Sequence, residues 1–163
     1  MENEDFRIWI QDNQTDIEKL LRQVRNYKIQ MREKVKTMRS FINIEKHNDC
    51  PAEITEWLYN PPGGEIQRFL VHDFKVSEEL KLAIDTIYSP SGWMITVVPR
   101  KPTTRAIIKD WFTDNNIPFN VSEKSSSRIV YGKLFDYHEK PAVIADALQE
   151  LIDRIVVAVQ NNV

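Results

Sequence analysis

Three cations and two hydroxyls gather in the segment PRKPTTR, residues 99–105, between a predicted strand and a predicted helix. Open α/β sheets tend to bind ligands at such strand-to-helix connections. A helix N-terminus already carries partial positive charge, so basic residues there are unfavourable unless an anion compensates them. Free backbone N–H groups, hydroxyls and cations together would suit a phosphate or carboxylate. The candidate anion-binding residues are Arg100, Lys101, Thr103, Thr104 and Arg105. The alternative is a solvated loop, since no glycine-rich fingerprint accompanies them.

A second pattern is the D-x-K triplet Asp73-Phe74-Lys75 at the end of a predicted strand, with Glu65 upstream. In metal-dependent nucleases of the restriction-enzyme type, two carboxylates hold Mg²⁺ and a lysine helps to activate water. Glu65, Asp73 and Lys75 are therefore weak candidates for a catalytic role. A three-residue pattern such as D-x-K often occurs by chance, and the competing interpretation is a solvated strand end.

Other catalytic chemistry has little support in the sequence. The histidines His47, His72 and His138 form no H-x-x-x-H pair, and the single cysteine, Cys50, has no pattern of a catalytic thiol around it. The chain contains no G-x-S-x-G, H-E-x-x-H or Walker A motif. We therefore predict no metal site and no cofactor, and an enzyme is disfavoured.

Charge is strongly segregated along the chain. Residues 19–39 contain eight basic side chains against Glu33 alone, a net of +7. Because the whole chain carries −2, the remainder must carry −9. The basic face consists of Arg22, Arg25, Lys28, Arg32, Lys36 and Arg39. The acidic residues of the C-terminal segment offer one partner for this face, and the phosphates of a nucleic acid offer another.

The same basic stretch lies in a predicted helix over residues 16–42. Thr15 and Glu18 fit a capping box at its start. A heptad seam of apolar residues, broken by Lys34, predicts pairing with another helix. The seam positions assigned to oligomerisation are Ile17, Leu20, Val24, Tyr27, Met31 and Met38. A helix of this length exceeds the width of a small domain, so part of it should project or pair with another chain.

The remaining pattern predicts an α+β (or α/β) fold, with the long amphipathic helix followed by a small mixed β-sheet flanked by helices. An apolar content of 42% and a charged content of 28% are typical of a globular chain. We expect an N-terminal segment, 1–45, and a compact domain, 46–163. Further helices are expected at 51–58, 77–87, 103–112 and 141–159, and strands at 68–74, 93–98 (central), 119–121 and 128–135.

These patterns favour a non-enzymatic binding or regulatory protein. It would self-associate, as a dimer, through its N-terminal helix and present a surface to a macromolecular partner. The alternative is a nucleic-acid-binding protein that uses the basic helix and the Arg100–Arg105 loop, and a more distant one is the Mg²⁺-dependent nuclease. No apolar run is long enough to span a membrane, and the acidic start MENEDFRIWI is unlike a secretory signal. A cytoplasmic location without membrane contact is expected.

Overall fold

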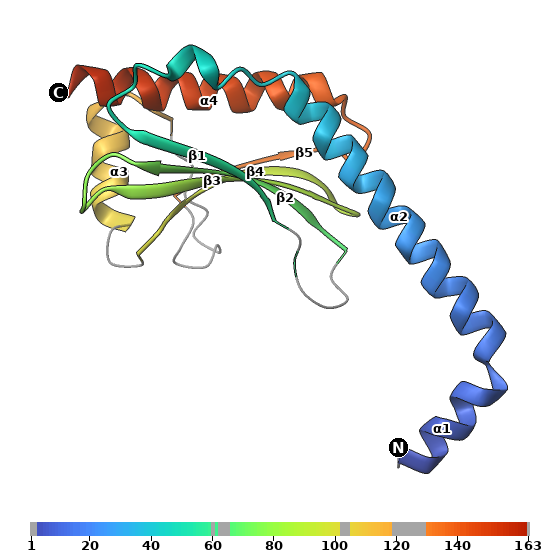
Figure 1. The fold of residues 1–163 in the computed structure, drawn as a ribbon. Helices are drawn as coiled ribbons and strands as arrows, with labels where there is room; N and C mark the ends of the chain where they lie inside the picture. The colour runs from blue at the N-terminus through green and yellow to red at the C-terminus, as the bar shows by residue number, and fades with distance from the viewer. Residues whose placement is uncertain (1–2, 60, 62–65, 102–104, 119–129, 163) are drawn as a thin grey trace.

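The structure is a computed structural model that describes residues 3–59, 61, 66–101, 105–118 and 130–162. It consists of helices and one sheet (Figure 1). The helices are α1 (Asn3–Asp12), α2 (Gln14–Ser40), the short 3₁₀ helix η1 (Glu45–His47), α3 (Arg105–Asp114) and α4 (Pro141–Asn161). The strands are β1 (Glu53–Tyr59), β2 (Arg68–Lys75), β3 (Lys81–Ser89), β4 (Gly92–Pro99) and β5 (Tyr131–Phe135).

The five strands form one sheet in the order β1-β2-β3-β4-β5, and every neighbouring pair is antiparallel. This confirms the α+β class, although the sheet is an antiparallel meander rather than mixed. The middle strand is β3, and the run at 93–98 lies one position nearer the edge, in β4. Successive strands that pair with each other need only short connections, whereas parallel neighbours would need long crossovers.

The hydrophobic core lies between one face of the sheet and the helices α2 and α4. Figure 1 shows α4 running along this face, with the second half of α2 beside it. Met31, Val35 and Met38 of α2 are buried in the same cluster as Ile144 and Leu148 of α4. The C-terminal half of α2 is therefore part of the core.

Two predicted helices are strands. The segment expected as a helix at 51–58 forms β1, and the one expected at 77–87 forms β3. In β3 the buried residues Ile84, Thr86 and Tyr88 alternate with the less buried Asp85 and Ile87, which is the period of a strand. Isoleucine, threonine and tyrosine fit a pleated sheet well, and this preference outweighs the weak helical spacing of the same segment.

The long helix and the C-terminal helix are confirmed, as α2 and α4. Their boundaries differ slightly, because Asn13 rather than Thr15 precedes α2 and no side chain caps its first turn. The helix α1 was not predicted. The predicted strand at 128–135 is shorter, as β5, and the one at 119–121 lies outside the described residues.

The turn between β3 and β4 depends on a glycine. Gly92 has φ of +122°, and a Cβ atom there would lie 2.4 Å from the backbone oxygen of Phe135. Only glycine fits this close approach, which lets β5 lie against β4 at the end of the hairpin.

Candidate functional site

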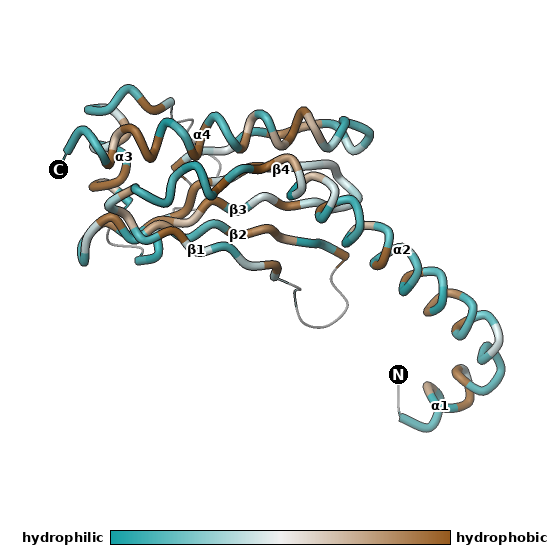
Figure 2. The backbone as a smooth tube through the Cα atoms, turned by 45° about the horizontal axis from the view of Figure 1, so that its top comes forward, coloured by the Kyte–Doolittle hydropathy of each residue, from teal (hydrophilic) through white to brown (hydrophobic). Residues whose placement is uncertain are grey.

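Many of the exposed apolar side chains among the described residues lie on a helical arm, residues 3–30, that comprises α1 and the first half of α2. Both Figure 1 and Figure 2 show α1 standing well apart from the sheet. No residue of α1 is buried, and the first buried residue of α2 is Met31. The large apolar side chains exposed along the arm are Phe6, Ile8, Trp9, Ile10, Leu20, Leu21 and Ile29. Helices in proteins owe most of their stability to packing of such a face. Among the apolar side chains of the arm, only Tyr27, near its end, belongs to the described side chains that pack against the core.

The predicted seam is divided between the arm and the core. Ile17 and Val24 are half-buried and Leu20 is 60% exposed, whereas Met31 and Met38 are fully buried against the body of the same chain. Met31 and Met38 could not contact a second chain without opening the core. Only the N-terminal part of the seam, up to Val24, is available for another molecule.

Tyr27 marks the point where the seam meets the body. Its hydroxyl lies 2.8 Å from the hydroxyl of Tyr137, and its pKa is raised to about 12 by burial and by this hydrogen bond. One turn later, the ammonium of Lys34 lies 5.6 Å from the ring centroid of Tyr88 and 5.4 Å from that of Tyr137. Lys34 interrupts the apolar seam because it meets two aromatic rings of its own chain there.

The C-terminal end of α2 is fixed to the sheet by a buried polar contact. Arg39 donates to Glu56 of β1 and to the carbonyl oxygen of Ile42. The other carboxylate oxygen of Glu56 lies 2.7 Å from Nε2 of His72, a fully buried side chain. Burial raises the pKa of Glu56, but hydrogen bonds from His72 and Arg39 outweigh burial and leave it below its ordinary value. Arg39, predicted as part of a solvated basic face, is instead a structural residue.

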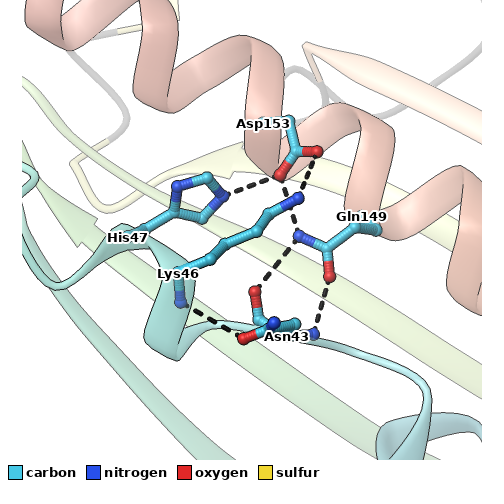
Figure 3. A network of polar contacts seen from close by, with 5 residues as sticks. All are labelled: Asn43, Lys46, His47, Gln149 and Asp153. Atoms are coloured by element: carbon cyan, nitrogen blue, oxygen red, sulfur yellow. Dashed lines mark hydrogen bonds and ion pairs between the residues drawn. The ribbon is translucent and has the colours of Figure 1, made fainter.

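A second polar network holds the segment after α2 against α4 (Figure 3). Asp153 of α4 accepts from Lys46 at 2.7 Å and lies 2.7 Å from Nε2 of His47. Gln149 accepts from the backbone N–H of Asn43 at 2.7 Å and donates to Asp153. Together the two networks fix the direction in which α2 leaves the body. Lys46 and His47, which follow α2, thus contact Asp153 of α4. No described ion pair joins the acidic side chains of α4 to the basic face of α2.

The rest of the predicted basic face points outward. Arg22, Arg25 and Arg32 are exposed, whereas Lys36 pairs with Glu33 at 3.2 Å. Beside Arg25 and the half-buried Lys28, where α2 approaches β2, there is a hollow of about 400 Å³, which we call the basic hollow. It is lined by Leu21, Val24, Arg25, Lys28, Ile29 and Arg68. Burial and repulsion from Arg32 lower the pKa of Arg68, so positive charge is concentrated here.

The sheet has a second face, opposite α2 and α4, on which no described helix lies. Residues paired across antiparallel strands point to the same side, so the register defines this face. One row across it consists of Tyr59, Phe69, Ile87, Met94 and Leu134, and the next includes Trp57 and Asp85. Trp57 is 41% exposed and Leu134 is 78% exposed, so this face offers aromatic and aliphatic side chains to another molecule.

Carboxylates lie next to these aromatic side chains. Asp73 accepts a hydrogen bond from the indole N–H of Trp57 at 2.9 Å and pairs with Arg100. Asp85 lies diagonally across from Asp73, and its pKa is raised mainly by burial and further by the charge of Asp73. Thr55, Asp73 and Arg100 line a hollow of about 250 Å³ at this end of the face.

The arrangement around Asp73 gives the nuclease hypothesis little support. A guanidinium, that of Arg100, occupies one side of the carboxylate where a metal ion would bind, and Lys75 pairs with Glu78 at 2.6 Å. Glu65 lies outside the described residues. Within the part of the chain that the structure describes, no cluster of three or more acidic, histidine or cysteine side chains could hold a metal ion.

The predicted anion-binding residues are only partly brought together. Arg100 turns to Asp73, Lys101 follows β4, and Arg105 begins α3. Thr103 and Thr104 lie outside the described residues. A groove of about 610 Å³ lies elsewhere, between the end of α3 and α4, where Asn116, Asp153 and Val157 line it.

Comparisons of this chain with known protein families, with curated proteins and with solved structures found no match. Among the helices that the structure describes, none is long and apolar enough to cross a membrane. The pattern of the sequence indicated the basic helix and its seam. It missed α1 and the second face of the sheet, although the cluster FRIWI and the alternation of β1 were visible signals.

Proposed function

We propose that this chain is a non-enzymatic binding protein that self-associates through its arm and presents its body to a macromolecular partner. The observation that carries the proposal is the apolar seam of α2, which extends beyond the body. Its C-terminal half is core, and its N-terminal half continues into solvent with Leu20 and Leu21 each about 60% exposed. Exposed apolar patches of this kind are typical of interaction sites.

A second copy of the chain is the partner that we propose for the arm. Heptad seams pair with similar seams, and no described residue of the arm is fully buried by its own body. The contacts of Arg39 and of Asp153 hold α2 at a fixed angle to the body. The arm is therefore already oriented before two copies meet. Preorganised elements bind more tightly because less conformational entropy is lost.

The second face of the sheet is the surface that we propose for the macromolecular partner. It combines exposed aromatic rings, such as Trp57 and Tyr59, with the carboxylates of Asp73 and Asp85. Aromatic side chains are enriched at the centres of protein interfaces. A dimer would present two copies of this face, and bivalent binding is stronger than either single contact.

Substitution of the seam tests the self-association. The double variant Leu20→Gln, Leu21→Gln keeps the charge and the helix propensity of α2 but removes the exposed apolar side chains. We expect light scattering behind a sizing column to give a dimer for the unmodified chain and a monomer, or at least tenfold weaker association, for the variant. The control is Asn26→Gln, which changes an exposed polar residue of the same helix. Equal masses for all three proteins would contradict the proposal.

Nucleic-acid binding remains a second candidate because Arg22, Arg25 and Arg32 are exposed, and no described carboxylate pairs with them. Phosphate contacts would make such binding fall steeply with salt. A labelled short duplex that binds at low salt, is released at high salt and ignores the Leu20 and Leu21 substitutions would favour this candidate over self-association.

A further inference from the structure

The arm changes the sign of its charge in its middle. Residues 3–18 contain five acidic side chains and Arg7, a net of −4. Residues 19–30 contain four basic side chains and no acidic one, a net of +4. The acidic half is about four turns long and the basic half about three. The arm bends between α1 and α2, at Asn13, and its side-chain charge changes sign along the first turns of α2 (Figure 1).

This distribution decides how two arms can lie together. In a parallel pair, −4 would lie beside −4 and +4 beside +4, and both halves would repel. In an antiparallel pair, each acidic half lies beside the basic half of the other copy. Charges a few ångströms apart at an interface lie within the Debye length of about 8–10 Å, so this difference persists at physiological salt. Complementary charge sets orientation and register in helix pairs.

We infer that two copies of this chain pair antiparallel along their arms, so that the acidic, aromatic α1 of one copy docks against the basic hollow of the other. The two-fold axis lies near Glu18 and Lys19, where the charge changes sign. Pairing about this axis sets residues 14–18 of one copy beside residues 19–23 of the other. It brings α1, which bends away from the line of α2, towards residues 24–32 of that other copy (Figure 1). This inference rests on the proposed function, and it adds the orientation and the contacting surfaces.

The chemistry of the two surfaces matches. In α1 the rings of Phe6 and Trp9 stack with their centroids 6.1 Å apart, and both are about half exposed. The basic hollow has an apolar floor that includes Leu21 and Ile29, and basic residues at its rim. Aromatic rings of α1 would cover the apolar floor, and its carboxylates would face the guanidinium groups.

Electrostatics within the chain also favours an acidic occupant. Arg68 lines the basic hollow, and its pKa is lowered by burial and by the neighbouring charge of Arg32. Arg25 has no carboxylate partner among the described residues. The carboxylates of Asp5 and Asp12, brought from the second copy, would relieve this repulsion. In both views, α1 of the same chain lies apart from β2, the strand that carries Arg68 (Figures 1 and 2).

Charge reversal in three combinations tests the orientation. The base-reversed variant carries Arg22→Glu and Arg25→Glu, the acid-reversed variant carries Asp12→Lys and Glu18→Lys, and the combined variant carries all four. All four positions are exposed on the helices, and circular dichroism would verify that each variant is folded. Sedimentation velocity of the full chain over a range of concentrations gives the dissociation constant of each dimer.

An antiparallel dimer gives a distinctive result. Each two-residue variant should dissociate about tenfold more readily or worse, because several attractive pairs become repulsive on both sides of the axis. The combined variant should return to within about threefold of the unmodified chain, because opposite charges again face each other. A parallel dimer would be weakened by neither two-residue variant, since each reversed residue would still face an identical copy of itself.

The other outcomes separate this inference from the proposed function. A dimer that none of the charge variants affects, yet that Leu20→Gln with Leu21→Gln dissociates, would overturn the antiparallel docking and leave self-association in place. Weakening by both sets without rescue in the combined variant would also overturn it. An unmodified chain that is monomeric at every concentration would overturn both.

Discussion

Glu56 shows how one side chain joins the arm-bearing helix to the sheet. Its two oxygens contact Arg39 of α2 and His72 of β2, and the side chain is only 22% exposed. Removal of one member of this partly buried set leaves the polar groups of the others without a partner. The resulting loss of stability is larger than the net stabilisation that the contact itself provides. The ion pair therefore has a structural role, and the basic residue in it is not available to a ligand.

The pKa of Glu56, lowered in the folded chain, makes this contribution depend on pH. The stabilisation is complete above the ordinary value of 4.5 and is lost as the pH falls through the lower pKa of the folded state. We expect Glu56→Gln to lower the free energy of unfolding by about 1–3 kcal/mol at pH 7. In urea titrations from pH 7 to pH 3, this difference should shrink as the pH falls below 4.5. The control is Glu53→Gln, on the exposed side of the same strand. A difference that stays constant over this range would contradict the assignment.

At the scale of elements, the sequence predicted a helix correctly where apolar residues kept helical spacing over many turns. The helix α4 has nine buried residues at helical spacing, and α2 has its stripe of apolar and basic residues, so both were predictable. Short segments such as β1 were ambiguous, because seven residues satisfy either period, and their strand state follows from pairing with β2. Contacts between residues that are far apart in the sequence could not be predicted either. The residues around Lys34 give no sign that its ammonium lies over the rings of Tyr88 and Tyr137.

The exposure of apolar side chains changes sharply within α2, between two residues that are two positions apart. Met31 is 1% exposed and Ile29 is 53% exposed. We expect Met31→Ala to lower the free energy of unfolding by about 2–4 kcal/mol, through lost burial and the cavity left behind. We expect Ile29→Ala to change it by less than about 0.5 kcal/mol but to weaken the dimer. Chemical denaturation and sedimentation of both variants measure this pair of effects. Equal losses of stability would show that the arm packs on its own body.

On the scale of the whole molecule, the chain divides into a body with a closed core and an arm without one. The core between the sheet and the two long helices is continuous, and it is completed by residues of α2 from Met31 onward. The arm before Met31 carries apolar side chains and segregated charge without packing against the sheet (Figure 2). Under the proposed function, the arm with its segregated charge serves recognition, while the body provides the stability of the fold.

Hydrogen exchange of the full chain at increasing protein concentration tests the central claim, that copies of the chain meet through their arms. Unpacked helices open readily and exchange fast, whereas helices in an interface are protected. We predict that deuterium uptake in residues 3–30 slows as the concentration rises through the range of dimer formation. Uptake in residues 141–161, which form the core helix α4, should stay slow throughout. Fast uptake along the arm at every concentration, with α4 protected, would contradict the account.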